Sequence, residues 1–282
     1  IVLIVAAVPE GLPTIVAVSL ALNIIKMSRE NALVKKMIAC ETIGCVNIIC
    51  SDKTGTLTEN KMTVQKIYTN GELIEPEALK DEILLKNYCI NSNANISMED
   101  GNWSFIGNPT ECSLLAAAAK AGVDYQKLRH EADVVHVFPF SSQNKDMSTI
   151  VRENGKEILY VKGNPEKILS LCSGISEEEK EKNFRLMEDF QSKAGRLLAF
   201  AHKELSGYHG EPQEEVEQRL IYDGFVVISD PLSPDVYESI RNCQSAGIEV
   251  KMLTGDNIRT ARAIANELHM LDENHIAVEA SD

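Results

Sequence analysis

CSDKTGTLT, residues 50–58, is the stretch that decides how this chain is interpreted. It follows residues 46–49, a short apolar run rich in β-branched side chains, which predicts a buried strand. Asp52 therefore falls just past the carboxyl end of a strand, where open α/β sheets place their ligands. The threonine hydroxyls around it, with Gly55 allowing close approach of the backbone, suit a loop that holds a phosphoryl group while a carboxylate attacks it. The alternative is a local turn in which Asp52 caps the backbone.

Length, charge and cysteine content narrow the class of protein. A chain of 282 residues typically forms two or so domains. The net charge of −14 argues against nucleic acid as a partner, because its phosphates would be repelled. The seven cysteines are scattered and contain no CxxC pair, which indicates reduced thiols rather than a disulfide framework or a zinc site.

The first 25 residues form an apolar run in which Glu10 is the one charged side chain. As a helix this run would be about 37 Å long, more than a hydrocarbon core of about 30 Å, so we expect a transmembrane helix over residues 1–26. A buried helix of a soluble protein is the alternative. Cations follow the run closely and predict that its carboxyl end faces the cytoplasm. These cations are Lys26, Arg29, Lys35 and Lys36.

Residues 8–13, VPEGLP, make a continuous helix unfavourable within this run. Two prolines and a glycine free backbone carbonyls, which survive at membrane depth only where they line a cavity. An ionised Glu10 near the bilayer centre would cost on the order of 2.5–3.5 kcal/mol, so it should have a partner there. Carbonyl oxygens with one carboxylate make a hard-oxygen site for a cation such as Ca²⁺. The alternative is a proline kink with Glu10 protonated or reaching the membrane interface.

PEGLP followed by DKTGTLT resembles the fourth transmembrane helix and the phosphorylation loop of P-type cation pumps. Residues 39–44, ACETIG, resemble the calcium-pump branch, and the resemblance extends through essentially the whole chain. It implies ATP hydrolysis through an aspartyl-phosphate on Asp52, with Lys53 in the same catalytic loop and Mg²⁺ held by the Asp52 carboxylate and the Thr54 carbonyl. It also implies a site for the transported cation, Ca²⁺, with a pump for another cation such as Mn²⁺ as the alternative. Its ligands would be the carbonyls of Val5, Ala6 and Val8 and the carboxylate of Glu10.

Residues 65–221 are long enough to fold as a separate domain. Helices are expected at residues 73–91 and 111–121, and strands at 134–140, 148–152 and 157–162. Three motifs in this segment, in order, are similar to the nucleotide-binding domain of these pumps. They are GNPTE at residues 107–111, Phe140 with Lys145 and Met147, and KGNPE at residues 162–166. The resemblance implies ATP as the ligand, with Phe140 stacking on adenine and Glu111 accepting from its amino group. The residues expected to face the rest of the nucleotide are Lys145, Lys162, Gly163 and Arg196. The family often has an arginine two residues after the phenylalanine, where this chain has Ser142.

The segment from residue 222 returns to alternating strands and helices, with strands expected at 224–229 and 248–253 and helices at 236–246 and 257–268. The sequence TGDN at 254–257 ends a strand and opens a helix, so its hydroxyl and N–H groups suit a phosphoryl oxygen. The alternative is a helix cap. By resemblance Thr254 and Gly255 hold the phosphoryl group and Asp256 lies near the nucleotide. Asp230 resembles the family's hinge aspartate, although its continuation, Leu232-Ser233, departs from the commoner one with arginine.

The expected fold class is therefore α/β. It comprises a transmembrane helix at 1–26, a haloacid-dehalogenase-like phosphorylation domain at 27–64 and 222–282, and an inserted α+β nucleotide-binding domain at 65–221. The chain ends before the family's GDGVNDA-type segment, so we expect an incomplete phosphorylation domain in a fragment that does not pump alone. We expect the intact protein to be an integral membrane protein with cytoplasmic catalytic domains. The actuator domain and the other transmembrane helices are expected to be the partners of this chain.

Two other functional classes remain at this point. A soluble phosphatase of the same superfamily would carry a second aspartate as acid and base where Thr54 stands, and the apolar run also argues against it. A non-catalytic nucleotide-binding module would bind ATP without being phosphorylated.

Overall fold

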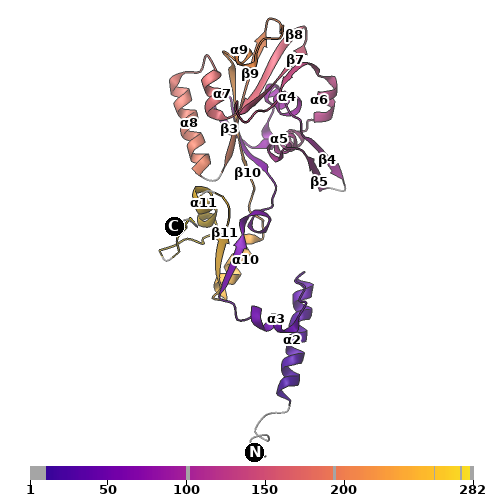
Figure 1. Cartoon of the computed structure of the whole chain (residues 1–282), viewed down its shortest axis with the longest axis vertical. Coiled ribbons are helices and arrows are strands. Elements are labelled where there is room, and N and C mark those ends of the chain that lie inside the picture. Colours follow the sequence, from indigo (N-terminus) through magenta and orange to yellow (C-terminus); the bar gives the residue numbers. More distant parts are fainter. Residues whose placement is uncertain (1–10, 100–101, 193–194, 257, 274, 280–282) are drawn as a thin grey trace, which may run out of the picture. The chain divides into compact units, whose positions relative to one another are not determined.

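The computed structural model describes residues 11–99, 102–192, 195–256, 258–273 and 275–279 and shows a mixed α/β chain (Figure 1). The chain divides into two compact units. The first comprises the described residues up to Ser51 together with Tyr237–Lys251. The second comprises Asp52–Val236 and the described residues from Met252 onward.

The first unit contains an apolar helix, α2 (Leu12–Arg29). Among the described residues it is the one helix that is long and apolar enough to cross a membrane. Proline stands in its first turn, and Lys26 and Arg29 lie in its last turn. None of its side chains is buried. A helix with this much exposed apolar surface needs lipid or protein around it.

The remainder of the first unit is α3 (Met37–Ile43), most of α10 (Val236–Ser245) and a sheet of two strands, β1 (Ile48–Asp52) and β11 (Glu249–Leu253). A strand before the DKTGT loop is confirmed, but it lies at Ile48–Asp52 rather than at residues 46–49, so Asp52 is its last residue. The prediction that the strand is buried is wrong. Ile48 and Ile49 are 49% and 37% exposed. In the described part of the chain β1 has β11 as its sheet neighbour, and two strands bury little of each other's side chains.

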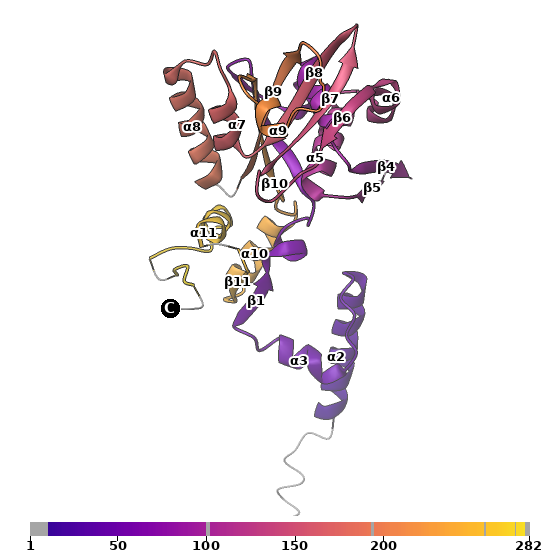
Figure 2. The ribbon, with the colours of Figure 1, turned by 45° about the horizontal axis from the view of Figure 1, so that its top comes forward.

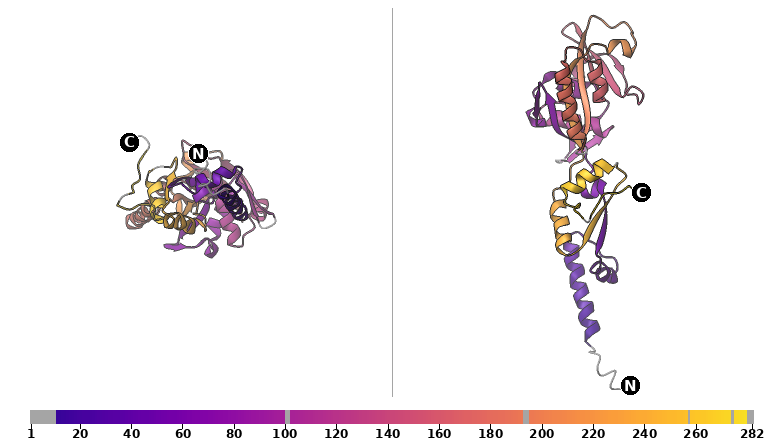
Figure 3. Two further views of the ribbon diagram at one scale, coloured as in Figure 1. Left: turned by 90° about the horizontal axis from the view of Figure 1, so that it is seen from below. Right: turned by 90° about the vertical axis from the view of Figure 1, so that its left-hand side faces the viewer.

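The second unit is built on an antiparallel sheet of seven strands in the order β3-β2-β10-β9-β8-β7-β6. Successive residues of β10 point to opposite faces, so Val226 and Ile228 enter one core and Phe225 and Val227 the other. Helices α4, α5 and α6 cover the first face, and α7 and α8 cover the second, as the views from two angles agree (Figures 1 and 2). The right-hand view of Figure 3 has α7 and α8 in front of the sheet.

The strands of this sheet are β2 (Thr63–Thr69), β3 (Glu72–Ile74), β6 (Asp133–Phe138), β7 (Asp146–Glu153), β8 (Lys156–Gly163), β9 (Arg196–Leu205) and β10 (Ile221–Ser229). Its helices are α4 (Glu82–Ile90), α5 (Pro109–Lys120), α6 (Tyr125–Glu131), α7 (Pro165–Leu171), α8 (Glu177–Ser192) and α9 (Gln213–Val216). The unit also contains a hairpin, β4 (Asn95–Glu99) with β5 (Asn102–Ile106), and α11 (Ile258–Glu267).

Two buried asparagines attach α4 to the sheet. The amide of Asn87 donates to the carbonyl of Val161 at 3.0 Å. The amide of Asn91, at the end of α4, donates to the carbonyls of Met147 and Tyr160 at 3.1 and 3.2 Å. Both side chains are fully buried, so these bonds satisfy polar groups that water does not reach.

The predicted helix at residues 73–91 is wrong over its first half. Asn70 and Gly71, both with positive φ, form the turn of a hairpin that pairs β2 with β3. A short turn at Pro76–Ala78 follows, and α4 begins only after Asp81, whose carboxylate caps it by accepting from the N–H groups of Ile83 and Leu84. The predicted strand at 134–140 likewise ends two residues early, at Phe138.

Gly224 lies at a β-bulge of β10, and we expect Gly224→Ala to destabilise the chain by about 2–3 kcal/mol. Its φ is +130°, and an added Cβ would lie 1.9 Å from the carbonyl oxygen of Tyr68 on β2. The matched control is Gly155→Ala, which also has a positive φ (+79°) but nothing within 4 Å of an added Cβ. Urea denaturation in mild detergent measures both, and equal losses would contradict the role of the close contact.

Candidate functional site

The DKTGT loop, residues 52–56, is a tight turn that begins at Asp52, the last residue of β1. Gly55 takes a φ of +74°, which a residue with a Cβ rarely adopts. Its N–H donates to the hydroxyl oxygen of Thr58 at 3.3 Å, and the N–H of Thr58 donates to the carbonyl of Lys53 at 3.0 Å. The loop is therefore closed on itself beyond the carboxylate of Asp52, as its glycine and threonines predict.

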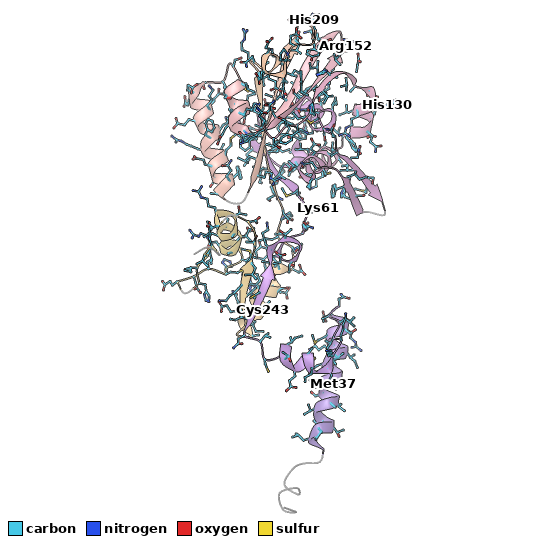
Figure 4. The ribbon with its side chains drawn as sticks, viewed as in Figure 1. Met37, Lys61, His130, Arg152, His209 and Cys243 are labelled. Carbon is cyan, nitrogen blue, oxygen red and sulfur yellow. The ribbon has the colours of Figure 1, made fainter. Side chains whose placement is uncertain are left out.

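Asp230 supports this loop from the end of β10. The buried hydroxyl of Thr58 donates to one Asp230 carboxylate oxygen at 2.6 Å, and the N–H of Lys61 donates to the other at 2.8 Å. The N–H of Glu59 also donates to the carbonyl of Pro231 at 3.0 Å. Lys61, labelled in Figure 4, lies where the chain leaves the loop and approaches β2. Asp230 thus ties together the two segments that connect to the seven-stranded sheet.

The TGD segment follows β11 and lies beside the DKTGT loop. Lys53 forms an ion pair with Asp256, and both side chains are at least half-buried. The N–H of Asp256 donates to the hydroxyl oxygen of Thr254 at 3.1 Å, which fixes the turn through Gly255. The residues expected to attack and to hold a phosphoryl group therefore come from two loops that are 200 residues apart in the sequence and joined by this ion pair.

A buried ion pair forms the centre of the expected nucleotide site. The ammonium of Lys162 on β8 lies 2.5 Å from the carboxylate of Glu111 on α5, with side-chain exposures of 5% and 15%. The second Glu111 oxygen accepts from the N–H of Asn93 at 3.1 Å. Burial by itself would raise the pKa of Glu111, but the Lys162 charge and these hydrogen bonds lower it below its usual value. Burial lowers the pKa of Lys162, and the Glu111 carboxylate opposes this effect.

The other expected nucleotide residues lie around this pair or on the adjoining strands. The guanidinium of Arg196 donates to the hydroxyl of Thr110, the neighbour of Glu111, at 3.1 Å. Lys145 is exposed, in a loop that reaches Gly163. A Cβ on Gly163 would lie 2.7 Å from the Lys145 carbonyl oxygen, so this close approach requires glycine. Phe140 lies past the end of β6 with 61% of its surface exposed, which leaves an aromatic face open for stacking.

Some expected residues receive no structural description, and some contributing residues were missed. Val5, Ala6, Val8 and Glu10, expected to bind the transported cation, lie outside the described residues, as does Asn257 of TGDN. Asn93 and Thr110, which bond to Glu111 and Arg196, were missed. Thr110 could have been found from the sequence. Asn108 followed by Pro109 indicates a helix start, which places Thr110 and Glu111 together in the first turn of α5.

Residues 80–235 match the family model described as P-type ATPase, cytoplasmic domain N. This match covers more than half of the chain. The chain belongs to the P-type ATPase family. In this P-type ATPase chain the matched segment begins just before α4 and ends just before α10. It contains the Lys162–Glu111 pair.

Curated relatives align with nearly all of this P-type ATPase chain. It is 38% identical to the calcium-transporting ATPase PAT1 of Dictyostelium discoideum, over 99% of the chain and 26% of the relative. It is 34% identical to a calcium-transporting ATPase of Bacillus subtilis, over 96% of the chain and 34% of the relative. It is 35% identical to the cation-transporting ATPase pma1 of Synechocystis, over 95% of the chain and 33% of the relative. The chain thus spans about a quarter to a third of the length of these relatives.

Proposed function

We propose that this chain is the catalytic part of an ATP-driven cation pump that is phosphorylated on Asp52. The observation that carries the proposal is the Lys53–Asp256 ion pair, which joins the DKTGT loop to the TGD loop. A carboxylate at a strand's end, beside a second loop rich in N–H and hydroxyl donors, is the arrangement that covalent phosphoryl transfer needs. The proposed domain containing both loops is haloacid-dehalogenase-like, in the parts 27–64 and 222–282.

In the proposed reaction a carboxylate oxygen of Asp52 attacks the γ-phosphorus of ATP in line, and ADP leaves as the bond to its β-phosphate oxygen breaks. The Thr254 hydroxyl and the Gly255 N–H hold an oxygen of the transferred group. The Asp52 carboxylate and the Thr54 carbonyl are hard-oxygen donors that fit Mg²⁺, which when bound would neutralise phosphate charge. Asp256 keeps Lys53 in place beside the loop, and Asp230 keeps Thr58 in place at its end.

ATP would bind to the domain expected at residues 65–221, whose seven-stranded sheet also includes β10 (Ile221–Ser229). Phe140 supplies the exposed ring for the adenine base. Glu111, held by Lys162, is placed to accept from the adenine amino group. The cations Lys145 and Arg196, with the backbone at Gly163, would face the ribose and phosphates. Lys162 serves mainly by keeping Glu111 ionised in a half-buried position.

The transported cation is proposed to be Ca²⁺, bound in the membrane by the carbonyls of Val5, Ala6 and Val8 and the carboxylate of Glu10. Helix α2, exposed and apolar, is the proposed cytoplasmic half of that membrane helix. The membrane helix was expected over residues 1–26, and α2 ends at Arg29. Two of the three relatives above are named calcium-transporting ATPases. The third is named a cation-transporting ATPase, a name that specifies no ion, and Mn²⁺ remains the alternative cargo.

The test is phosphorylation of the proposed full-length pump in membranes from radiolabelled ATP, with Ca²⁺, with Mn²⁺ and with a chelator. We expect a label that needs Ca²⁺ and is released by hydroxylamine, because acyl phosphates react with that nucleophile. A label that needs Mn²⁺ instead would keep the pump and replace the ion. Absence of any label in folded protein that binds ATP would leave only a nucleotide-binding module.

A further inference from the structure

The loop that carries Lys145, residues 141–146, is held by side chains from two helices. The ammonium of Lys167 on α7 donates to the carbonyl of Asn144 at 2.8 Å and pairs with the carboxylate of Asp146. The amide nitrogen of Gln213 on α9 donates to the other Asp146 oxygen at 3.1 Å. Asp146 is fully buried, so these partners replace water around its charge.

A second buried carboxylate, Glu217, joins this group just after α9 and is 2% exposed. One of its oxygens accepts from the hydroxyl of Ser148 at 2.7 Å and from the amide of Gln213 at 2.8 Å. Gln213 therefore donates to both carboxylates, Asp146 and Glu217. The Lys167 ammonium pairs with Asp146, whereas Glu217 accepts from the neutral groups of Ser148 and Gln213, so the buried Glu217 is more stable when it carries a proton.

The position of Asp146 is coupled to the expected nucleotide residues. Asp146 pairs with Gly163, and Met147 with Lys162, in the ladder between β7 and β8. The N–H of Asn164 donates to the carbonyl of Lys145 at 3.0 Å. The two strands approach closely here, since a Cβ added at Gly163 would lie 2.7 Å from the Cβ of Asp146. A displacement of Asp146 would therefore move the neighbouring Lys145 relative to Lys162.

We propose that Asp146, Lys167, Gln213 and Glu217 form a loop clamp that positions Lys145 for the nucleotide, and that a proton held between its two carboxylates tightens the clamp. These residues are positioning residues, since none of them is expected to touch ATP. The inference rests on the proposed function, because it assigns nucleotide binding to the loop that the clamp holds.

The charge of the loop clamp changes near neutral pH. Burial raises the pKa of Glu217 to about 7, and Asp146 adds to the rise against the hydrogen bonds from Gln213 and Ser148. Below this value Glu217 is neutral. Above it Glu217 adds a second buried negative charge to that of Asp146, and their repulsion loosens the loop. The other nearby charges are Lys203 of β9, bonded to the carbonyls of Val216 and Gln218, and the exposed Glu214 and Glu215 of α9.

The test is the affinity of the 282-residue chain for Mg·ATP, measured about one pH unit below and above pH 7 in the wild type, Glu217→Gln and Glu217→Ala. We expect the wild-type Kd to rise about three- to tenfold with pH, as loss of a buried hydrogen bond implies. Glu217→Gln copies the neutral state of Glu217. Between the two pH values its Kd should therefore change only through the ionisation of ATP, an effect that is the same for every variant. Glu217→Ala should bind about three- to tenfold more weakly than the wild type at the lower pH.

The matched control is Glu214→Gln, the same change at an exposed position of α9, which should follow the wild type. Amide exchange at residues 141–146 without nucleotide should be faster in Glu217→Ala and unchanged in the control. If the wild type binds ATP but Glu217→Gln keeps its pH dependence, the loop clamp is overturned and the proposed function stands. If the wild type binds no ATP, both are overturned. Should Glu217→Ala fail to fold, the near-isosteric Glu217→Gln still decides.

Discussion

Replacing Asp52 by asparagine in the proposed full-length pump is expected to abolish acid-stable labelling from radiolabelled ATP, a loss on the order of 10³-fold or more. The amide has no anionic oxygen to attack phosphorus, and it is a weaker ligand for Mg²⁺ than the carboxylate. The change is nearly isosteric at the end of β1, so the turn closed by Gly55 and Thr58 should persist. Mg·ATP affinity should therefore stay within about twofold of the wild type.

Glu59→Gln is the matched control for Asp52→Asn. Glu59 is an exposed acid next to the same loop, and its contact with Pro231 is made by its backbone N–H, which the substitution keeps. Its labelling should equal that of the wild type. A hydroxylamine-sensitive label of normal amount in Asp52→Asn would show that another carboxylate is the nucleophile and would refute the assignment.

Replacing Lys162 by methionine is expected to lower the free energy of unfolding of the nucleotide-binding part by about 3–5 kcal/mol. The substitution leaves the Glu111 carboxylate largely buried without a positive charge beside it, with hydrogen bonds from the Asn93 N–H and the Ser92 side chain. The 15% exposure of Glu111 favours the lower end of that range. Chemical denaturation of the chain in mild detergent gives the loss, and Mg·ATP binding should weaken in the same variant.

The control for Lys162→Met lies on the same strand. Lys156→Met breaks an ion pair with Glu204 at 2.9 Å in which both side chains are more than half exposed, so it should cost less than about 1 kcal/mol. Adding Glu111→Leu to Lys162→Met should recover much of the lost stability, because the unpaired charge is then removed, but not the affinity for ATP. Equal losses for Lys156→Met and Lys162→Met would contradict the importance of burial at this pair.

Local patterns were sufficient to predict the strand before Asp52, the strands β7, β8, β10 and β11, and the turn chemistry of the two loops. Apolar runs bounded by polar residues determine these elements. The prediction was wrong at residues 73–91, where the Asn70-Gly71 turn signal and the cap at Asp81 both argue for a hairpin followed by a later helix start.

Contacts between distant segments could not be predicted in the same way. Gln213 and Asp146 are 67 residues apart, and neither belongs to a recognisable motif. Their meeting depends on how the chain brings α9 to the first residue of β7, which periodicity does not encode. The exposure of β1 had a similar cause, since burial of a strand depends on its neighbours in the sheet rather than on its own sequence.

The asparagines that attach α4 to the sheet also determine which arrangement of the domain is lowest in energy. A purely apolar helix face could slide by one turn along the strands and lose little, because one set of aliphatic contacts resembles another. Here such a slide would separate Asn87 and Asn91 from the carbonyls of Val161, Met147 and Tyr160 and leave their amides unsatisfied in a dry interior. At about 1–3 kcal/mol for each unsatisfied group, the alternative registers are excluded, and this face of the nucleotide-binding sheet has a single way to pack.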